Sequence, residues 1–291
     1  MGLLDGKVAI ITGAGGGLGR SHALLLASEG AAIVVNDLGG DRAGGGGGKR
    51  MADQVVDEIK AAGGEAVANY DSVATVEGGQ GILKTALDAF EKADILINNA
   101  GILRDKSYAN MEEADWDAVI TVHLKGAYCA TRPVFRHMKE RGEGGVIVNT
   151  SSTSGLIGNF GQTNYGAAKA GIAGFTRCLA IEGKKYGIRV WGLAPVAVTR
   201  MTEDLPGMSS DQMRELMDPT QVSPAVLYMV SDLSKDRTGR FLFAGGARVR
   251  EMKMAWSEGI SKSDGGRISA EEIAASEDKI FLPEDERGIM G

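Results

Sequence analysis

Short apolar segments alternate with longer segments of helical composition along most of the chain. The apolar segments are only a few residues long and are bounded by glycine, asparagine or aspartate, which is typical of strands buried on both faces of a parallel sheet. The predicted strands are Lys7–Ile11, Ala32–Val35, Ala66–Ala68, Asp94–Ile97, Val146–Val148, Arg189–Leu193 and Arg240–Phe243. The predicted helices are Arg20–Gly30, Met51–Ala62, Gly79–Lys92, Asp115–Arg141 with a kink at Pro133, Tyr165–Tyr186 and Ser223–Leu233.

This alternation predicts the α/β class, with one doubly wound parallel sheet of about seven strands in a single-domain Rossmann fold spanning residues 1–246. Residues 247–291 are more charged and lack strand signals, so we expect a C-terminal extension of uncertain order. Within it, Ser269 and Glu272 have the spacing of a capping box that opens a short helix. The glycine-rich residues 38–49 are expected to form a surface loop, and residues 199–222 a mobile lid.

A glycine-rich turn follows the first predicted strand. The sequence TGAGGGLG places Gly13, Gly17 and Gly19 between this strand and the next helix, and Asp37 follows eighteen residues after Gly19. A glycine turn lets the backbone approach a pyrophosphate, and the helix N-terminus supplies free N–H groups. A carboxylate at Asp37 can accept hydrogen bonds from both ribose hydroxyls and would repel a 2′-phosphate. The pattern therefore predicts a dinucleotide site that prefers NAD to NADP.

Tyr165 and Lys169 are four residues apart in a predicted helix, so their side chains share one face. A tyrosine phenol ionises near pH ~10, and a neighbouring ammonium group favours the phenolate. Ser152, thirteen residues before Tyr165, lies in a Ser/Thr/Gly-rich loop and can hydrogen-bond a substrate oxygen. An isolated Tyr-x-x-x-Lys pair is commonly an ordinary surface pair. The dinucleotide motif earlier in the chain favours the interpretation as a proton-transfer pair.

Composition excludes several other classes. The 291 residues are 43% hydrophobic and carry a net charge of −6, which does not favour binding to nucleic acid or to an anionic membrane surface. No apolar run reaches the ~18–20 residues of a membrane span, and the N-terminal residues do not resemble an export signal. Cys129, Cys178 and the three histidines form neither a disulfide framework nor a metal-ligand cluster. We expect a cytoplasmic protein without a metal.

Together, four motifs resemble the short-chain dehydrogenase/reductase family over about residues 5–246: the glycine-rich turn, the sequence NNAG at 98–101, Ser152, and YGAAK at 165–169. The resemblance implies that Ser152, Tyr165 and Lys169 are catalytic and that Thr12 and the NNAG turn stabilise the central sheet. Lys169 would also hold the nicotinamide ribose. The cofactor contacts implied by the resemblance are Gly13, Gly17, Leu18, Gly19, Asp37, Asp71, Ser72, Asn99, Gly101, Tyr165, Lys169, Pro195 and Val198.

Longer matches point to one branch of this family. The sequences VNDLGGD at 35–41, NNAGILRD at 98–105, the run at 154–171 and TRMT at 199–202 resemble the (3R)-hydroxyacyl-CoA dehydrogenase unit of peroxisomal-type multifunctional enzyme 2. This resemblance implies NAD-dependent oxidation of a secondary alcohol to a ketone, or the reverse, by a homodimer or homotetramer. A hydroxysteroid dehydrogenase or a 3-oxoacyl-ACP reductase is the alternative enzyme. A non-catalytic NAD-binding sensor is the alternative of another class, although such proteins usually lack the tyrosine or the lysine.

Two residues leave alternatives open. His123 stands where most of the family has an asparagine that holds a water in a proton relay to the lysine, so His123 is a relay candidate. The alternative is a helix histidine whose ring hydrogen-bonds a backbone carbonyl. Asp71, after the third predicted strand, either meets an adenine amino group or simply caps a turn.

Overall fold

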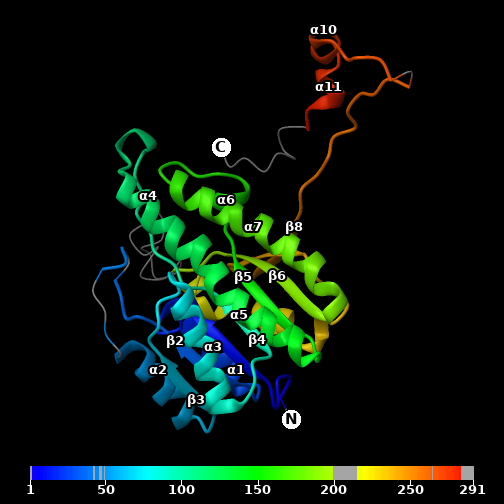
Figure 1. Cartoon of the computed structure of the whole chain (residues 1–291). Coiled ribbons are helices and arrows are strands. Elements are labelled where there is room, and N and C mark those ends of the chain that lie inside the picture. Colours follow the sequence, from blue (N-terminus) through cyan, green and yellow to red (C-terminus); the bar gives the residue numbers. More distant parts are fainter. Residues whose placement is uncertain are drawn as a thin grey trace. The chain divides into compact units, whose positions relative to one another are not determined.

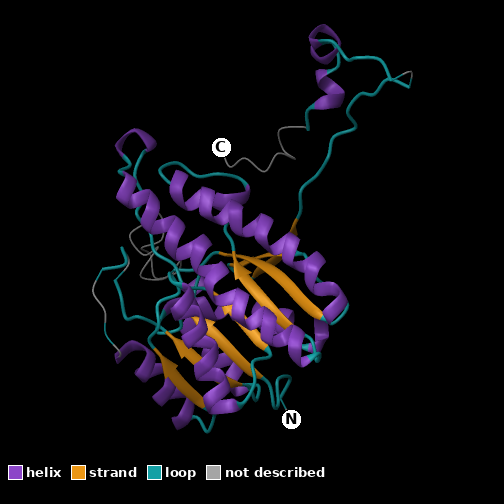
Figure 2. Cartoon of the chain, in the orientation of Figure 1, coloured by secondary structure: helices purple, strands orange, loops and turns teal. Residues whose placement is uncertain are grey.

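One eight-stranded sheet forms the centre of the protein, with the strand order β3-β2-β1-β4-β5-β6-β7-β8. The computed structural model describes residues 2–41, 43–45, 48, 50–198, 215–263 and 265–282. The pairs from β3 through to β7 are all parallel, and Figure 2 shows these strands as one twisted layer. The strands are β1 Val8–Thr12, β2 Ala32–Asn36, β3 Ala66–Asn69, β4 Ile95–Asn98, β5 Gly145–Thr150, β6 Ile188–Pro195, β7 Phe241–Gly245 and β8 Arg248–Met252.

Helices cover both faces of this sheet. Helices α1, α2 and α9 pack on one face, and α3, α5 and α7 pack on the other, where Figure 1 shows them side by side. The doubly wound α/β fold and all seven predicted strands are therefore confirmed. The helices are α1 Gly17–Ser28, α2 Arg50–Ala61, α3 Val76–Phe90, α4 Glu113–Ile120, α5 Gly126–Arg141, α6 Thr153–Leu156, α7 Thr163–Gly183, α9 Ser223–Val230, α10 Ala270–Ala274 and α11 Glu277–Ile280.

The continuous apolar strands serve two hydrophobic cores at once. In β1, Ala9 and Ile11 belong to the core shared with α1, whereas Val8 and Ile10 belong to the core shared with α3. Successive side chains of a strand point to opposite faces, so a strand covered on both sides needs apolar residues at every position. This is the physical reason that the apolar runs in the sequence located the strands.

The eighth strand was not predicted. A two-residue turn, Gly246-Ala247, separates β7 from β8, and both residues have positive φ values of 57° and 58°. Such a turn joins antiparallel neighbours with the twist of a sheet. The turn could not be predicted from the sequence, because alanine rarely adopts this conformation. The strand could not be predicted either, because most of β8 is charged and exposed. The expectation that no strand follows residue 246 was therefore wrong.

The predicted long helix Asp115–Arg141 is helical throughout, but one of its turns is not α-helical. Between α4 and α5 lies one π-helical turn, Thr121–Lys125, that contains the buried His123. Pro133, where a kink was expected, lies within α5. A π turn accommodates an extra residue in a helix and is frequent at functional sites. Its hydrogen-bond pattern has no simple sequence signal, so the hydrophobic period did not reveal it.

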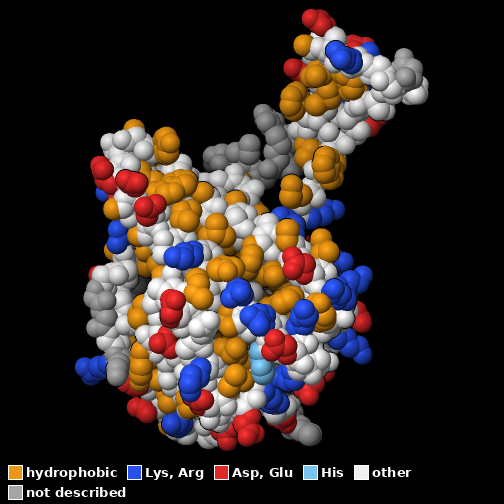
Figure 3. Space-filling model, viewed as in Figure 1, with side chains coloured by type: hydrophobic (Ala, Val, Ile, Leu, Met, Phe, Trp, Pro, Cys, Tyr) orange, Lys and Arg blue, Asp and Glu red, His pale blue; other side chains and the backbone are white. Residues whose placement is uncertain are grey.

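The chain divides into two compact units, Met1–Glu251 and Met252–Gly291. In the second unit, Ser269 Oγ accepts a hydrogen bond from Glu272 N at 3.2 Å, and Ser269 N donates to the Glu272 carboxylate at 2.8 Å. The predicted capping box is thus confirmed. In the first unit, positive and negative side chains are interspersed over the face shown in Figure 3. Most of the predicted lid, residues 199–214, falls outside the described residues.

A buried histidine joins the first helix to the last helix of the first unit. His22 of α1 is fully buried, and its Nδ1 lies 2.8 Å from Ser223 Oγ at the start of α9. Its Nε2 has no hydrogen-bond partner among the described residues. Burial lowers the pKa of His22 to about 3, and burial also lowers the pKa of His123 to about 3. Both rings are therefore neutral in the folded protein at neutral pH.

We expect the free energy of unfolding to fall as the pH drops below about 6.5. At pH values between the unfolded pKa and the folded pKa, each of the two histidines binds a proton in the unfolded chain but not in the folded protein. The loss should approach about 1.4 kcal/mol per pH unit for each histidine. Urea denaturation of the wild type and of His22→Gln between about pH 6.5 and 5 measures it. The pKa of His137 is also lowered by burial, so the variant should lose between about a third and a half of the dependence. Identical slopes would contradict the assignment.

Candidate active site

The loops that follow β1 and β4 are tied together at the carboxyl edge of the sheet. Thr12 Oγ1 accepts hydrogen bonds from the backbone N–H groups of Asn99 at 3.0 Å and Ala100 at 3.1 Å. In return, Asn99 Nδ2 donates to the carbonyls of Thr12 at 3.0 Å and Gly13 at 3.1 Å. β1 and β4 are neighbours at the point where the strand order reverses. In open α/β sheets, the crevice at this point is the ligand site.

The glycine-rich turn has the form of a dinucleotide cradle. Gly13 has a φ of +64°, and a Cβ there would lie 2.8 Å from Ala100 Cα. A Cβ at Gly19 would lie 2.2 Å from the Gly13 carbonyl oxygen. Gly16, which precedes α1, provides no side-chain cap, so the first N–H groups of this helix remain available to an anion. Gly17 and Leu18 form the start of this helix. These residues fit a pyrophosphate group.

Asp37 lies directly after β2, beside the glycine-rich turn. One carboxylate oxygen accepts a hydrogen bond from Gly15 N at 2.8 Å, and the other accepts one from Gly39 N at 2.7 Å. These bonds fix the carboxylate at the carboxyl end of β2 and leave it further lone pairs for hydroxyl donors. The carboxylate is thus held where the ribose of a bound dinucleotide is expected.

Asp71 and Ser72 follow β3. Asp71 Oδ2 accepts a hydrogen bond from Asn69 Nδ2 at 2.8 Å, and the Asp71 carbonyl accepts one from Asn36 Nδ2 at 2.9 Å. Ser72 Oγ accepts a hydrogen bond from Ala74 N at 3.2 Å. Both side chains thus stabilise the turn, which is the role given by the alternative that Asp71 simply caps a turn. The contact of Asp71 with adenine stays a prediction.

Tyr165, Lys169 and Ser152 come together from α7 and the start of α6. Lys169 Nζ lies 5.4 Å from the centre of the Tyr165 ring and donates a hydrogen bond to the Thr150 carbonyl at 2.5 Å. Ser152 precedes α6, where its Oγ accepts a hydrogen bond from Ser154 N at 3.1 Å. Ser152 also lies close enough to Tyr165 to lower the pKa of its phenol. The predicted proton-transfer residues therefore form one constellation.

The electrostatics of this constellation differ from the expectation that Lys169 makes Tyr165 acidic. Burial raises the pKa of Tyr165 to about 12, against a lowering contribution from the Ser152 hydrogen bond, and the charge of Asp105 raises it further. Lys169 is 2% exposed, and burial lowers the pKa of its amine to about 7. Lys169 is therefore only partly charged near neutral pH, because its own desolvation weakens the charge that was expected to act on the phenol.

His123 contacts both the backbone and the tyrosine. Its Nε2 lies 2.8 Å from the Ile102 carbonyl oxygen and 3.1 Å from Ile102 N. Its ring meets the Tyr165 ring edge-on, with the centroids 5.2 Å apart. The backbone contact matches the simpler alternative for His123. The second ring nitrogen, Nδ1, is buried and has no hydrogen-bond partner within the described part of the chain.

A small cavity of about 10 Å³ is lined in part by His123 and Lys169. Its polar lining includes Thr12, Asn98, His123, Thr150 and Lys169. Two of these residues have a buried side-chain atom, His123 Nδ1 and Thr150 Oγ1, with no hydrogen-bond partner among the described residues. The volume is close to the smallest that holds one water molecule, and a buried water needs two to four polar partners. The cavity therefore suits a single water between His123 and Lys169.

The remaining predicted contacts lie at the same edge of the sheet. Pro195 ends β6, and Val198, three residues later, donates its N–H to the Met217 carbonyl at 2.6 Å. Sequence reasoning missed Thr150, whose carbonyl binds Lys169, and Gln162, whose buried amide links the loops around the site. The polar run before Tyr165 was the available signal for Gln162. A backbone acceptor such as Thr150 leaves no sequence signal.

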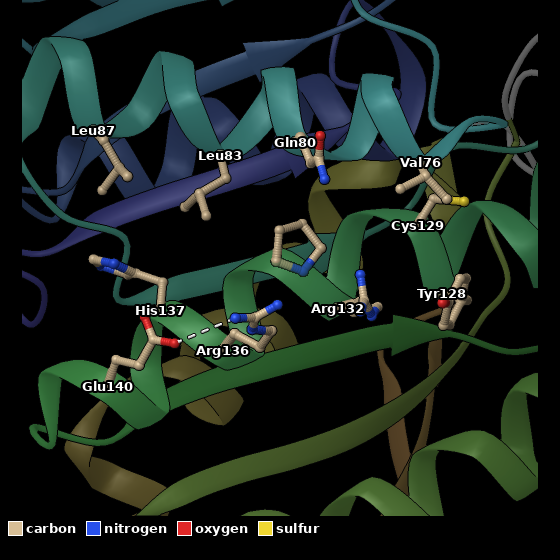
Figure 4. Close-up of a pocket in the computed structure, with 11 residues that line it drawn as sticks. Val76, Gln80, Leu83, Leu87, Tyr128, Cys129, Arg132, Arg136, His137 and Glu140 are labelled. Atoms are coloured by element: carbon tan, nitrogen blue, oxygen red, sulfur yellow. Dashed lines mark ion pairs between the residues drawn. The ribbon is translucent and has the colours of Figure 1, made fainter.

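A separate groove of about 240 Å³ lies between α3 and α5 (Figure 4). Leu83 and Leu87 of α3 face Arg132, Arg136 and His137 of α5 across it. Ser152, Tyr165 and Lys169 do not line this groove. The groove is therefore not the candidate active site, although it is larger than the cavity beside His123. Within the described residues there is no cluster of side chains that could hold a metal ion and no helix long and apolar enough to cross a membrane.

The comparisons with known proteins all point to the same family. The family model described as short chain dehydrogenase matches residues 7–209. A short-chain type dehydrogenase/reductase of Mycobacterium tuberculosis is 49% identical over 255 residues, which cover 88% of this chain and 87% of that protein. The peroxisomal multifunctional enzyme type 2 of Mus musculus is 48% identical over 242 residues. The match covers 83% of this chain and 32% of the mouse enzyme, so this chain spans about a third of its length.

Solved structures share the fold described above. The crystal structure of a short chain dehydrogenase from Mycobacterium avium has a TM-score of 0.84 and 42% identity, and the match covers 97% of this chain and 98% of that chain. A short chain dehydrogenase from Mycobacterium paratuberculosis bound to NAD has a TM-score of 0.76 and 25% identity, and the match covers 83% of this chain and 97% of that chain.

We expect Gly101→Ala to displace His123 and to destabilise the protein. A Cβ at residue 101 would lie 2.3 Å from His123 Cε1, so the buried imidazole must move. The expected loss is about 1–3 kcal/mol in the free energy of unfolding. Gly174→Ala in α7 is the matched control, since nothing lies within 4 Å of a Cβ there. It should stabilise the helix by up to about 1 kcal/mol, and equal unfolding curves for the two variants would contradict this packing.

Proposed function

Because this chain belongs to the short-chain dehydrogenase family, and is therefore an oxidoreductase, we propose that it oxidises a (3R)-3-hydroxyacyl-CoA to the 3-oxoacyl-CoA with NAD. The observation that carries the proposal is the meeting of Ser152, Tyr165, Lys169 and His123 beside the dinucleotide cradle. The motifs shared with the (3R)-hydroxyacyl-CoA dehydrogenase unit of multifunctional enzyme 2 support the substrate class.

Tyr165 is the proton acceptor in this proposal. The Ser152 hydroxyl hydrogen-bonds the substrate oxygen, and the Tyr165 phenolate removes the hydroxyl proton. When bound, the oxidised nicotinamide ring would accept the hydride, and its positive charge would favour the phenolate. Since burial raises the pKa of Tyr165 to about 12, the unassisted phenol strongly favours its protonated form. That form donates a proton to a ketone, so the same residues serve reduction.

Lys169 and a water held by His123 pass the proton from Tyr165 on toward solvent in this proposal. The pKa of Lys169, lowered to about 7 by burial, suits an amine that gains and loses a proton near neutral pH. One water in the adjoining cavity would hydrogen-bond His123 Nδ1, Thr150 Oγ1 and the lysine amine. His123 is a hydrogen-bonding partner of this water rather than a cation, since burial keeps its pKa at about 3.

An exposed aromatic side chain lies five residues before Tyr165 in the chain. Phe160, in the loop between α6 and α7, is 89% exposed. An exposed aromatic side chain this close to Ser152 and Tyr165 along the chain is suited to an acyl chain, and burying it on substrate binding would be favourable. This supports an apolar substrate.

A screen of NAD reduction tests the proposal. The panel should contain (3R)- and (3S)-3-hydroxyacyl-CoAs of graded chain length together with hydroxysteroids, and 3-oxoacyl-ACP with NADPH for the reverse reaction. We expect turnover of the (3R)-hydroxyacyl-CoAs with the highest kcat/KM. Preferential turnover of a hydroxysteroid or of 3-oxoacyl-ACP would replace the proposed substrate, and NADH binding without turnover of any alcohol would indicate a sensor.

Tyr165→Phe should lower kcat by about 10²–10⁴-fold, because it removes the proton acceptor while leaving the ring in place. NADH binding, measured by fluorescence titration, should stay near the wild-type value. A Phe variant that oxidises the substrate at nearly the wild-type rate would show that the proton leaves by another route.

Asp37→Ala should reduce the preference for NAD over NADP at least about tenfold in the ratio of kcat/KM values, a change of ~1.4 kcal/mol. The variant removes the carboxylate that would repel a 2′-phosphate. Asp41→Asn is the matched control, because the Asp41 carboxylate binds only Ala43 N and Gly45 N of its own loop among the described residues. If the ratio of the kcat/KM values for NAD and NADP is unchanged in Asp37→Ala, Asp37 does not bind the ribose.

A further inference from the structure

A buried side chain, Gln162, joins three segments of the candidate active site. Gln162 is 8% exposed and lies immediately before α7. Its Nε2 donates to Asp105 Oδ2 at 2.7 Å, and its Oε1 accepts from Ser154 Oγ at 2.8 Å and from Asn159 Nδ2 at 3.0 Å. Because a carboxylate only accepts hydrogen bonds, Asp105 fixes which end of the amide carries the N–H groups. The amide oxygen therefore faces the hydroxyl of Ser154 in α6.

Ser154 connects this amide to the hydroxyl of Ser152. The backbone N–H of Ser154 donates to Ser152 Oγ at 3.1 Å. A serine hydroxyl can accept two hydrogen bonds and donate one, so this contact occupies one lone pair and leaves the hydroxyl proton free for a substrate oxygen. The side chain of Ser154 is thus held by Gln162, while its backbone holds the hydroxyl of Ser152.

The turn that contains Ser154 needs support from outside. The helix α6 has only the four residues Thr153–Leu156, and a helix this short has little stability of its own. It packs closely on α7, since a Cβ at Gly155 would lie 2.5 Å from the Lys169 carbonyl carbon. Such a packing contact is not directional, whereas a hydrogen bond restrains both distance and angle. The bond from Ser154 to Gln162 supplies a directional restraint.

We infer that Gln162 is a positioning residue that, through Ser154, holds the Ser152 hydroxyl where it meets the substrate oxygen. The inference rests on the proposed function, since it concerns the hydroxyl that binds this oxygen. A misplacement of about 1 Å in a group that orients the substrate can cost about 100-fold in rate. Among the described residues, the side-chain hydrogen bonds of Gln162 reach none of the glycine-rich turn, so its loss should affect turnover and not cofactor binding.

Two variants break the link from its two ends. Gln162→Met keeps the length of the side chain but removes both polar atoms of the amide, and Ser154→Ala removes only a hydroxyl. Each should lower kcat for the best alcohol of the panel at least about threefold, with KM for NAD within about twofold of the wild type. The exposed Gln54→Met in α2 is the matched control and should keep the wild-type kcat. A wild-type kcat in Ser154→Ala would overturn the inference.

A double-mutant cycle with Ser152→Ala distinguishes positioning from a general structural effect. If Gln162 acts through the Ser152 hydroxyl, the change at residue 162 or 154 has nothing left to position once this hydroxyl is removed. Adding Gln162→Met or Ser154→Ala to Ser152→Ala should then lower kcat by less than about twofold. The same fold loss in both backgrounds would show that Gln162 acts independently of Ser152, which would overturn the inference.

A crystal structure of each variant gives a readout that needs no turnover. In Gln162→Met and in Ser154→Ala, Ser152 Oγ should move by at least about 0.5 Å or divide between two rotamers. If Gln162→Met does not fold, Ser154→Ala alone decides the question. A Ser152 hydroxyl that keeps its wild-type position and rotamer would contradict the inference. If the wild type oxidises none of the alcohols on the panel, the proposed function fails, while this comparison still decides whether Gln162 positions Ser152.

Discussion

Desolvation of two neighbouring groups, the Tyr165 phenol and the Lys169 amine, is the constraint on which the candidate chemistry depends. Burial penalises the charged form of each, which raises the pKa of the phenol and lowers that of the amine. The chain by itself therefore favours a neutral pair. A positive charge brought by a dinucleotide would shift this balance, so cofactor binding and readiness for proton transfer would be coupled.

The sheet determines where this pair can act. The carboxyl ends of the parallel strands lie in register, with Thr12 opposite Asn36 and Asn98 opposite Asn149. A single edge thus collects the cradle after β1, the carboxylate after β2 and the Thr150 carbonyl at the end of β5, which anchors Lys169. Segments that are far apart in sequence contribute to one crevice because parallel strands must end on the same side.

The sequence predicted those parts of the protein that depend on local pattern. Continuous apolar runs located the buried strands, and the four-residue spacing of Tyr165 and Lys169 placed both on one face of α7. The sequence did not predict features that depend on backbone geometry or on desolvation. The hairpin at Ala247 requires a conformation that alanine rarely adopts, and the weak charge of Lys169 follows from a burial that no motif expresses.

The π turn at Thr121–Lys125 has a consequence for how this site can change over time. Because such a turn holds one residue more than the regular helix needs, one residue can be lost there while α4 and α5 keep their own faces toward the core. The π turn is thus a point at which one residue of the candidate site can be gained or lost while the packing of both helices is kept.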